Sequence, residues 1–195
     1  MTATALIYIH GFNSSPLSAK AQQVQRYLQR HLPDATAYFP ALPYDPSAAM
    51  ALLEDLAASH QEVAFVGSSL GGFYATWLAE KTGGRAVLIN PAVRPWRYLN
   101  RYQGEIENYH TGERVLLQSS WADLLPQYHV ETISRPEKLL VLLQTGDETL
   151  DWRDAWQHYS ACNLYRALGG SHSFDHFDDM IPLILRFCAL TKDSV

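Results

Sequence analysis

Residues 63–72 read Val-Ala-Phe-Val-Gly-Ser-Ser-Leu-Gly-Gly. The stretch begins with an apolar run that is typical of a buried strand, and residues 73–81 after it are typical of a helix. A Gly-x-Ser-x-Gly motif between a strand and a helix predicts a nucleophile elbow, a tight turn that exposes a serine above the edge of a sheet. Gly67 and Gly71 are expected where a Cβ atom would collide with neighbouring backbone. Ser69 is therefore the candidate nucleophile.

Length and composition fit one globular domain over residues 1–195, with 47% hydrophobic and 18% charged residues. The net charge of −5 contains no basic block, which argues against nucleic-acid and anionic-membrane partners. Neither a bilayer-spanning apolar run nor a secretory leader is evident, so a cytoplasmic location is expected. Cys162 and Cys188 fall in a predicted strand and a predicted helix, where buried free thiols are expected and a disulfide or redox pair is the alternative.

Alternating strand and helix patterns run through most of the chain. Five further runs have the apolar composition of short strands, at residues 5–9, 35–39, 85–90, 138–144 and 163–167. Helical patterns lie between or after them, at residues 16–28, 46–56, 152–159 and 179–190, the last with Pro182 in its first turn. This order predicts an α/β fold with a mostly parallel central sheet and helices on both faces. Ligands of such sheets bind at the carboxyl ends of the strands.

Capping chemistry predicts where two of these helices begin. Ser15 is expected to cap the first helix, with Pro16 in its first turn and Leu17 on its apolar face. Asp45 is expected to cap the second helix, and Leu52 belongs to the apolar stripe of that helix.

The loop after the first strand is a candidate for binding an oxyanion. It begins His10-Gly11, and the backbone N–H of Phe12 is expected to act as an oxyanion donor together with that of Leu70, which follows the nucleophile. The alternative is that Gly11 only makes the turn and His10 forms a local hydrogen bond.

Residues 92–134 lack a sustained period and carry few strand signals. Aromatic side chains recur among polar ones in this stretch: Trp96, Tyr98, Tyr102, Tyr109, Trp121 and Tyr128. An insert at this position is expected to lie over the carboxyl edge of the sheet as a lid or cap that binds an acyl chain and excludes water. Aromatic packing that merely covers the sheet edge is the alternative.

The strand at residues 138–144 leads into a candidate catalytic acid. Asp147 follows it at the sheet edge expected for Ser69, and is the first choice to orient a histidine. Asp151 competes for this role but can instead cap the next helix, and Glu148 is expected to be solvated.

His172 is the candidate general base. It lies in a glycine-bearing loop after the last strand, and His176 is its possible substitute. Ser69, Asp147 and His172 follow one another in the chain order of the α/β-hydrolase triad.

A metal site is the rival interpretation of this last loop. Its potential ligands are His172, Asp175, His176, Asp178 and Asp179. Their spacing matches no recognised metal motif, and carboxylates are common near helix N-termini, so neither a metal nor another cofactor is expected.

Four motifs together resemble the YqiA-type esterases, a small bacterial family of α/β hydrolases. They lie at residues 10–16, 67–72, 144–148 and 169–174, and the similarity extends over nearly the whole length. The resemblance implies hydrolysis of carboxylic esters, with acyl-CoA thioesters as a further substrate class.

The residues themselves indicate acyl transfer to and from a serine. His172 would deprotonate Ser69 as it attacks, Asp147 would hold the imidazole tautomer, and Phe12 and Leu70 would receive the oxyanion. The expected partner is a small-molecule acyl ester or thioester. Two alternatives remain: a catalytically silent binding or scaffold protein on the same fold, and an acyltransferase that passes the acyl group to an acceptor other than water.

Overall fold

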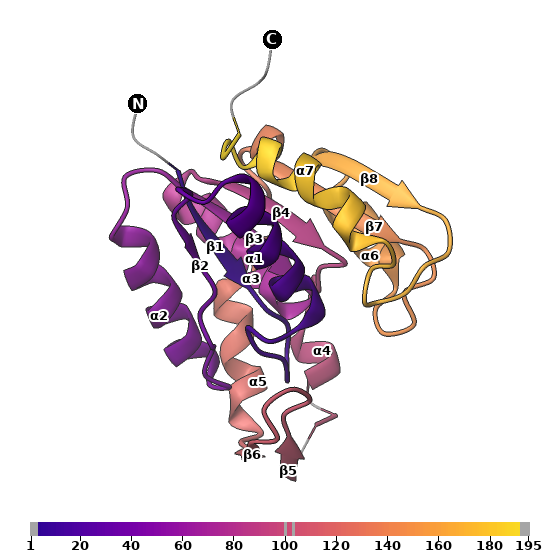
Figure 1. The fold of residues 1–195 in the computed structure, drawn as a ribbon. Coiled ribbons are helices and arrows are strands. Elements are labelled where there is room, and N and C mark those ends of the chain that lie inside the picture. The colour runs from indigo at the N-terminus through magenta and orange to yellow at the C-terminus, as the bar shows by residue number, and fades with distance from the viewer. Residues whose placement is uncertain (1–3, 100, 103, 192–195) are drawn as a thin grey trace.

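The computed structural model describes residues 4–99, 101–102 and 104–191, and its centre is a six-stranded sheet (Figure 1). Across the sheet, the strands are β2 (Ala37–Tyr38), β1 (Ala5–Ile9), β3 (Val63–Ser68), β4 (Arg85–Ile89), β7 (Leu139–Gln144) and β8 (Asn163–Ala167). All five neighbouring pairs are parallel. Their carboxyl ends therefore lie along one edge, where the candidate residues were expected to meet.

Helices cover both faces of the sheet. Figure 1 shows α1 (Ala19–His31) and α7 (Phe177–Phe187) in front of the sheet and α3 (Leu70–Thr82) behind it. The helices α2 (Pro46–Ala58) and α6 (Trp152–His158) also contribute buried residues to the α3 side. Because successive side chains of a strand point to opposite faces, Leu6 of β1 packs in the α1 and α7 core, whereas Ile7 packs in the α2 and α3 core.

The insert at residues 92–134 is more regular than its sequence suggests. It contains α4 (Trp96–Leu99), β5 (Gly104–Glu107), β6 (Arg114–Leu117), α5 (Ser120–Leu124) and the 3₁₀ turn η1 (Leu125–Tyr128), and η2 (Pro136–Lys138) follows it. Strands β5 and β6 form an antiparallel hairpin. Figure 1 shows the hairpin, α4 and α5 together at the end of the molecule opposite the two termini. Four-residue strands whose side chains are half-buried or exposed produce only a weak hydrophobic pattern, so the hairpin escaped prediction.

The first helix begins later than expected. Ser15 does not cap it, because the Ser15 hydroxyl accepts the N–H of Leu17 in a local turn at 3.1 Å, and the N-cap is Ser18. Leu17 therefore lies outside the helix and is 59% exposed. Both predictions were wrong because a serine side chain can complete a turn as readily as it caps a helix.

Two further helix details needed correction. Asp45 caps α2 as predicted, but Leu52 is 40% exposed, and Met50 lies in the buried face instead. Helix α7 begins at Phe177, two residues before the predicted start, so Pro182 lies inside the helix rather than in its first turn. Proline has no backbone N–H, so one carbonyl in the preceding turn of the helix lacks its usual donor. Pro182 is exposed, so water can reach this carbonyl.

Both cysteines are free thiols. Cys188 is buried, as predicted, and Cys162 is half-buried just before β8 rather than within it. Burial raises the pKa of the Cys188 thiol to about 12 and that of Cys162 to about 11. Among the helices of the described ranges, none has the length and apolar character that crossing a bilayer requires.

Candidate active site

Ser69 occupies the turn between β3 and α3 in a backbone conformation that serine rarely adopts. Its φ is +56°, and it is the N-cap residue of α3. A Cβ atom added to Gly67 would collide with the Gly71 carbonyl, and one added to Gly71 would collide with the Ile9 carbonyl. Only glycine fits at these two positions, as the motif predicted. The tight turn holds the Ser69 side chain at the carboxyl edge of the sheet.

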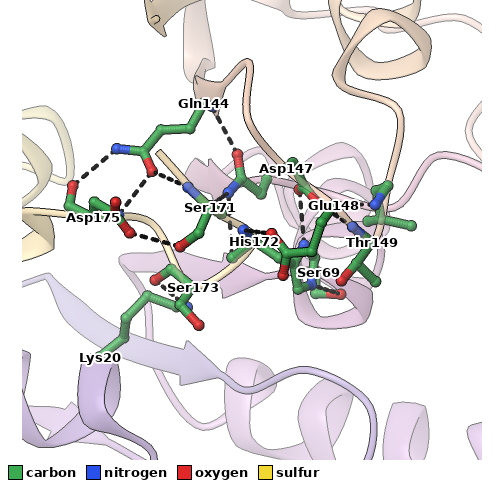
Figure 2. A network of polar contacts seen from close by, with 12 residues as sticks. Lys20, Ser69, Gln144, Asp147, Glu148, Thr149, Ser171, His172, Ser173 and Asp175 are labelled. Carbon is green, nitrogen blue, oxygen red and sulfur yellow. Dashed lines mark hydrogen bonds and ion pairs between the residues drawn. The ribbon is translucent and has the colours of Figure 1, made fainter. Parts of the chain in front are cut away.

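His172 lies within hydrogen-bond distance of both other candidate side chains, Ser69 and Asp147 (Figure 2). The Nε2 atom of His172 is 3.1 Å from the Ser69 hydroxyl oxygen, and its Nδ1 atom is 2.8 Å from Oδ2 of Asp147. The other Asp147 oxygen accepts the N–H groups of Thr149 and Leu150 at 2.9 and 2.8 Å. A carboxylate only accepts hydrogen bonds, so Nδ1 carries the ring proton and Nε2 is free to accept the serine proton.

The competing residues lie elsewhere. Asp151 caps α6 by accepting the N–H of Arg153 at 3.0 Å, which was its alternative role. That bond is the main reason why the pKa of Asp151 is lowered. His176 is exposed at the start of α7. Glu148 is exposed, but its carboxylate accepts the backbone N–H of His172 at 3.0 Å, so the expectation that it is merely solvated was incomplete.

The loop that carries Phe12 lies directly against the nucleophile. A Cβ atom on Gly11 would be 3.2 Å from the Cβ and 3.7 Å from the hydroxyl oxygen of Ser69. Phe12 and Leu70 line the same cleft as Ser69 and His172. The two residues whose backbone N–H groups are the expected oxyanion donors therefore line the cleft that holds the reacting atoms. The close approach of Gly11 to Ser69 leaves little room for a side chain at residue 11.

His10 forms the local hydrogen bond that was expected as its alternative role, and also a second one to a distant loop. Its Nδ1 atom is 2.9 Å from the Gly11 carbonyl, and its Nε2 atom accepts the N–H of Leu42 at 3.1 Å. The imidazole is buried, and burial lowers its pKa. A neutral ring that donates at Nδ1 and accepts at Nε2 satisfies both contacts and ties the Phe12 loop to the loop after β2.

Two adjoining cavities lie at the site, and Ser69 lines one of them. The cleft that contains Ser69 and His172 holds about 720 Å³ of empty space, part of which is open to solvent. The second cavity holds about 540 Å³, also partly open to solvent, and extends under the insert. The two share four lining residues: Phe12, Leu70, Leu99 and Tyr102. Their common wall is apolar and aromatic, which suits an apolar group next to the nucleophile.

Buried amides tie the insert to the loop beside Phe12. Asn108 donates to the Ser14 carbonyl at 3.1 Å and to the Tyr44 hydroxyl at 2.9 Å. Asn13 donates to the Glu107 carbonyl at 3.0 Å and accepts the Tyr44 hydroxyl at 2.8 Å. Sequence reasoning missed this network, because an asparagine in a loop does not reveal a partner that lies almost a hundred residues away.

Lys20 is a further neighbour of the site that the sequence did not indicate. Its ammonium donates to the Ser173 carbonyl at 2.9 Å, one residue after the candidate base (Figure 2). Burial lowers the pKa of Lys20 to about 8, and the nearby Asp147 charge opposes this shift. Lys20 therefore connects α1 to the loop that carries His172.

Two of the loop residues weighed as metal ligands make other side-chain contacts. His172 binds Asp147, and Asp175 accepts the Ser171 hydroxyl at 2.6 Å. Within the part of the chain that the structure describes, no cluster of three or more histidine, cysteine or acidic side chains is placed to hold a metal ion.

Residues 5–189 match the model of an uncharacterised protein family, UPF0227. The chain belongs to this family. UPF0227 is the YqiA-type family that the four motifs resemble, so the predicted relationship is confirmed. The match begins at β1 and continues past the end of α7, so it includes every strand of the central sheet.

Solved structures share the fold of this UPF0227 member at low sequence identity. Est1E from Butyrivibrio proteoclasticus with bound ferulic acid has a TM-score of 0.73 and 14% identity, over 95% of this chain and 88% of that chain. Paleococcus ferrophilus monoacylglycerol lipase has a TM-score of 0.67 and 14% identity, over 95% and 97% of the two chains. The esterase domain of a Rhodothermus marinus protein has a TM-score of 0.63 and 18% identity, over 96% and 85%. The predicted α/β-hydrolase fold is confirmed.

Proposed function

We propose that this UPF0227 member is a serine hydrolase that cleaves carboxylic esters, with acyl-CoA thioesters as a further substrate class. The observation that carries the proposal is that His172 contacts a serine hydroxyl through one ring nitrogen and a carboxylate through the other. Ser69 Oγ lies 3.1 Å from one nitrogen of His172, and Asp147 Oδ2 lies 2.8 Å from the other. This is the arrangement in which an imidazole can take a proton from a hydroxyl and remain correctly oriented.

Acylation would begin when Ser69 Oγ attacks the carbonyl carbon and His172 Nε2 takes its proton. Asp147 stabilises the imidazolium that forms, and the backbone N–H groups of Phe12 and Leu70 receive the oxyanion. His172 then donates its proton to the leaving alcohol or thiol as the carbonyl–oxygen or carbonyl–sulfur bond breaks. General-base help contributes about 10²–10⁴-fold and one oxyanion donor about 10²–10³-fold.

Deacylation repeats the same chemistry with water. His172 takes a proton from a water molecule as that water attacks the acyl carbon of Ser69. The new tetrahedral centre collapses, the Ser69 oxygen takes the proton back from His172, and the carboxylic acid leaves. The same oxyanion donors serve both halves of the reaction.

The two cavities support an apolar acyl group as substrate. The acyl chain would lie along the wall shared by Leu99 and Tyr102 and extend under the insert at residues 92–134, which would act as a cap that excludes water. The Est1E structure contains ferulic acid, an aromatic acid, on the same fold. Aromatic and medium-length acyl groups are therefore the first substrates to examine.

The test compares two adjacent serines. Ser69→Ala should abolish turnover of a short p-nitrophenyl ester while circular dichroism shows an intact fold. Ser68→Ala is the matched control, because Ser68 is a buried residue at the end of β3 and has no role in the proposed mechanism. Turnover retained by pure Ser69→Ala protein would dismiss the assignment. A panel of esters and acyl-CoAs of graded length then distinguishes esterase from thioesterase preference.

A further inference from the structure

Two amide side chains from other parts of the chain form hydrogen bonds with the loop that carries His172. Residues 171–175 lie between β8 and α7 without a regular strand or helix of their own. Oε1 of Gln144 accepts the N–H groups of Ser171 and Asp175 at 3.0 and 2.8 Å, and Nε2 of Gln144 donates to the Asp175 carbonyl at 2.9 Å (Figure 2). The Gln144 side chain, at the carboxyl end of β7, therefore forms hydrogen bonds with both ends of the loop.

Asn90, which directly follows β4, binds the first two residues of the same loop. Its Nδ2 atom donates to the carbonyls of Ser171 and His172 at 3.0 and 3.3 Å. Its Oδ1 atom accepts the backbone N–H of Gln144 at 3.0 Å. An amide suits this double role, because its nitrogen can donate to two carbonyls while its oxygen accepts a backbone N–H. Asn90 has a φ of +41° and is 2% exposed, so the surrounding structure fixes it firmly.

The segment that contains Asn90 also holds the nucleophile. The Ile89 carbonyl accepts the N–H of Ser69 at 3.0 Å, and the N–H of Ala92 donates to the Ser69 carbonyl at 3.1 Å. Residues 89–92 therefore bind the backbone of Ser69 through their own backbone and bind the His172 loop through the Asn90 side chain.

From these contacts we propose that Asn90 and Gln144 are positioning residues that set the distance between Ser69 Oγ and His172 Nε2. The inference rests on the proposed function, since it concerns how the triad is held. Asn90 and Gln144 are 2% and 5% exposed, so a substrate would not touch them, and they act through His172. A displacement of about 1 Å between reacting groups can lower a rate by about 10²-fold, so loss of either amide should slow acylation strongly.

The main experiment measures how fast a fluorophosphonate probe labels Ser69. Asn90→Ala removes all three hydrogen bonds, whereas Asn90→Asp keeps an acceptor for Gln144 but turns a second oxygen toward two carbonyls. Both variants should label about 10²-fold more slowly, and kcat for an ester should fall in parallel while KM stays near the wild-type value.

Gln144 provides a conservative rescue. Gln144→Glu keeps an acceptor for the N–H groups of Ser171 and Asp175 but turns its second oxygen toward the Asp175 carbonyl, so it keeps two of the three hydrogen bonds, whereas Gln144→Ala keeps none. It should therefore label faster than Gln144→Ala. If Asn90→Ala fails to fold, Asn90→Asp and the two Gln144 variants carry the same measurement.

Asn163 is the matched control for a purely structural effect. Its amide donates to the carbonyls of Glu137 and Leu139 at 3.2 and 3.1 Å, next to the amino end of β7. Asn163→Ala should lower the melting temperature and leave the labelling rate unchanged. Folded Asn90 variants that label as fast as wild type, or an Asn163 variant that slows labelling equally, would overturn the inference. Wild-type protein that is not labelled at all would instead refute the proposed function.

Discussion

Replacing Asp147 with asparagine changes one atom of the site and should force the imidazole into the wrong tautomer. Oδ1 of Asp147 accepts two backbone N–H groups, from Thr149 at 2.9 Å and Leu150 at 2.8 Å. In Asp147→Asn the amide oxygen must stay at that position, because an NH₂ group there would face two donors. The amide nitrogen therefore points at His172 Nδ1 from the place of Oδ2, which is 2.8 Å away.

The size of the effect follows from that orientation. His172 Nδ1 must accept a hydrogen bond from the amide, so the ring proton moves to Nε2, which faces the Ser69 hydroxyl at 3.1 Å. A protonated Nε2 cannot take the serine proton. In the type case of this triad, the same tautomeric error lowers kcat by about 10⁴-fold, which corresponds to about 5 kcal/mol in the barrier. The fold should change little, because both backbone bonds to Oδ1 are kept.

The assay is steady-state hydrolysis of a short p-nitrophenyl ester, with melting temperature as the measure of folding. Asp151→Asn is the matched control, since Asp151 caps α6 and pairs with the exposed Arg153 guanidinium at 3.2 Å, and asparagine caps a helix as well as aspartate does. We expect Asp147→Asn to lose nearly all turnover and Asp151→Asn to keep it. If the two variants were equally active, the assignment of Asp147 would be wrong.

Three further predictions test the surroundings of the site. Because burial lowers the pKa of His10, its neutral form stabilises the fold fully above about pH 6.5, and this contribution should fade as the pH drops below that value. Denaturation midpoints at pH 7, 6 and 5 should therefore fall less steeply for His10→Gln than for wild type, and parallel curves would contradict this role. Leu117→Trp should fill the cavity under the insert and raise KM for longer acyl esters but not for acetate, with about 0.8 kcal/mol lost per excluded methylene; an unchanged chain-length profile would place the acyl group elsewhere. Asn108→Ala should release the β5–β6 hairpin, so that limited proteolysis cuts it faster than in wild type, whereas equal protection would show that the amide network does not anchor it.

The strands of the central sheet, the elbow and the order of the candidate triad could be predicted because each leaves a local signal. Continuous apolar runs mark parallel strands that are buried on both faces. Gly67 and Gly71 mark a turn in which neighbouring carbonyls exclude a Cβ atom. Asp147 and His172 each follow a strand, so a parallel topology brings them to the edge where Ser69 lies.

The features that escaped prediction depend on contacts between distant parts of the chain. The short, half-exposed strands of the insert have no clear period, and Ser15 can complete a turn or cap a helix with the same chemistry. Asn90 and Gln144 bind backbone atoms of a loop that follows much later in the sequence, and nothing in the residues around them marks that loop as their partner. Such contacts become visible only once the sheet has been assembled.

The most direct measurement of the central claim is to map the site of covalent modification by a fluorophosphonate with peptide mass spectrometry. The probe reacts with a serine only when a neighbouring base activates it. We predict one adduct per chain, on Ser69, that is absent from Ser69→Ala and forms much more slowly in His172→Ala. An adduct on another residue, or an unmodified Ser69 in folded wild-type protein, would contradict the account.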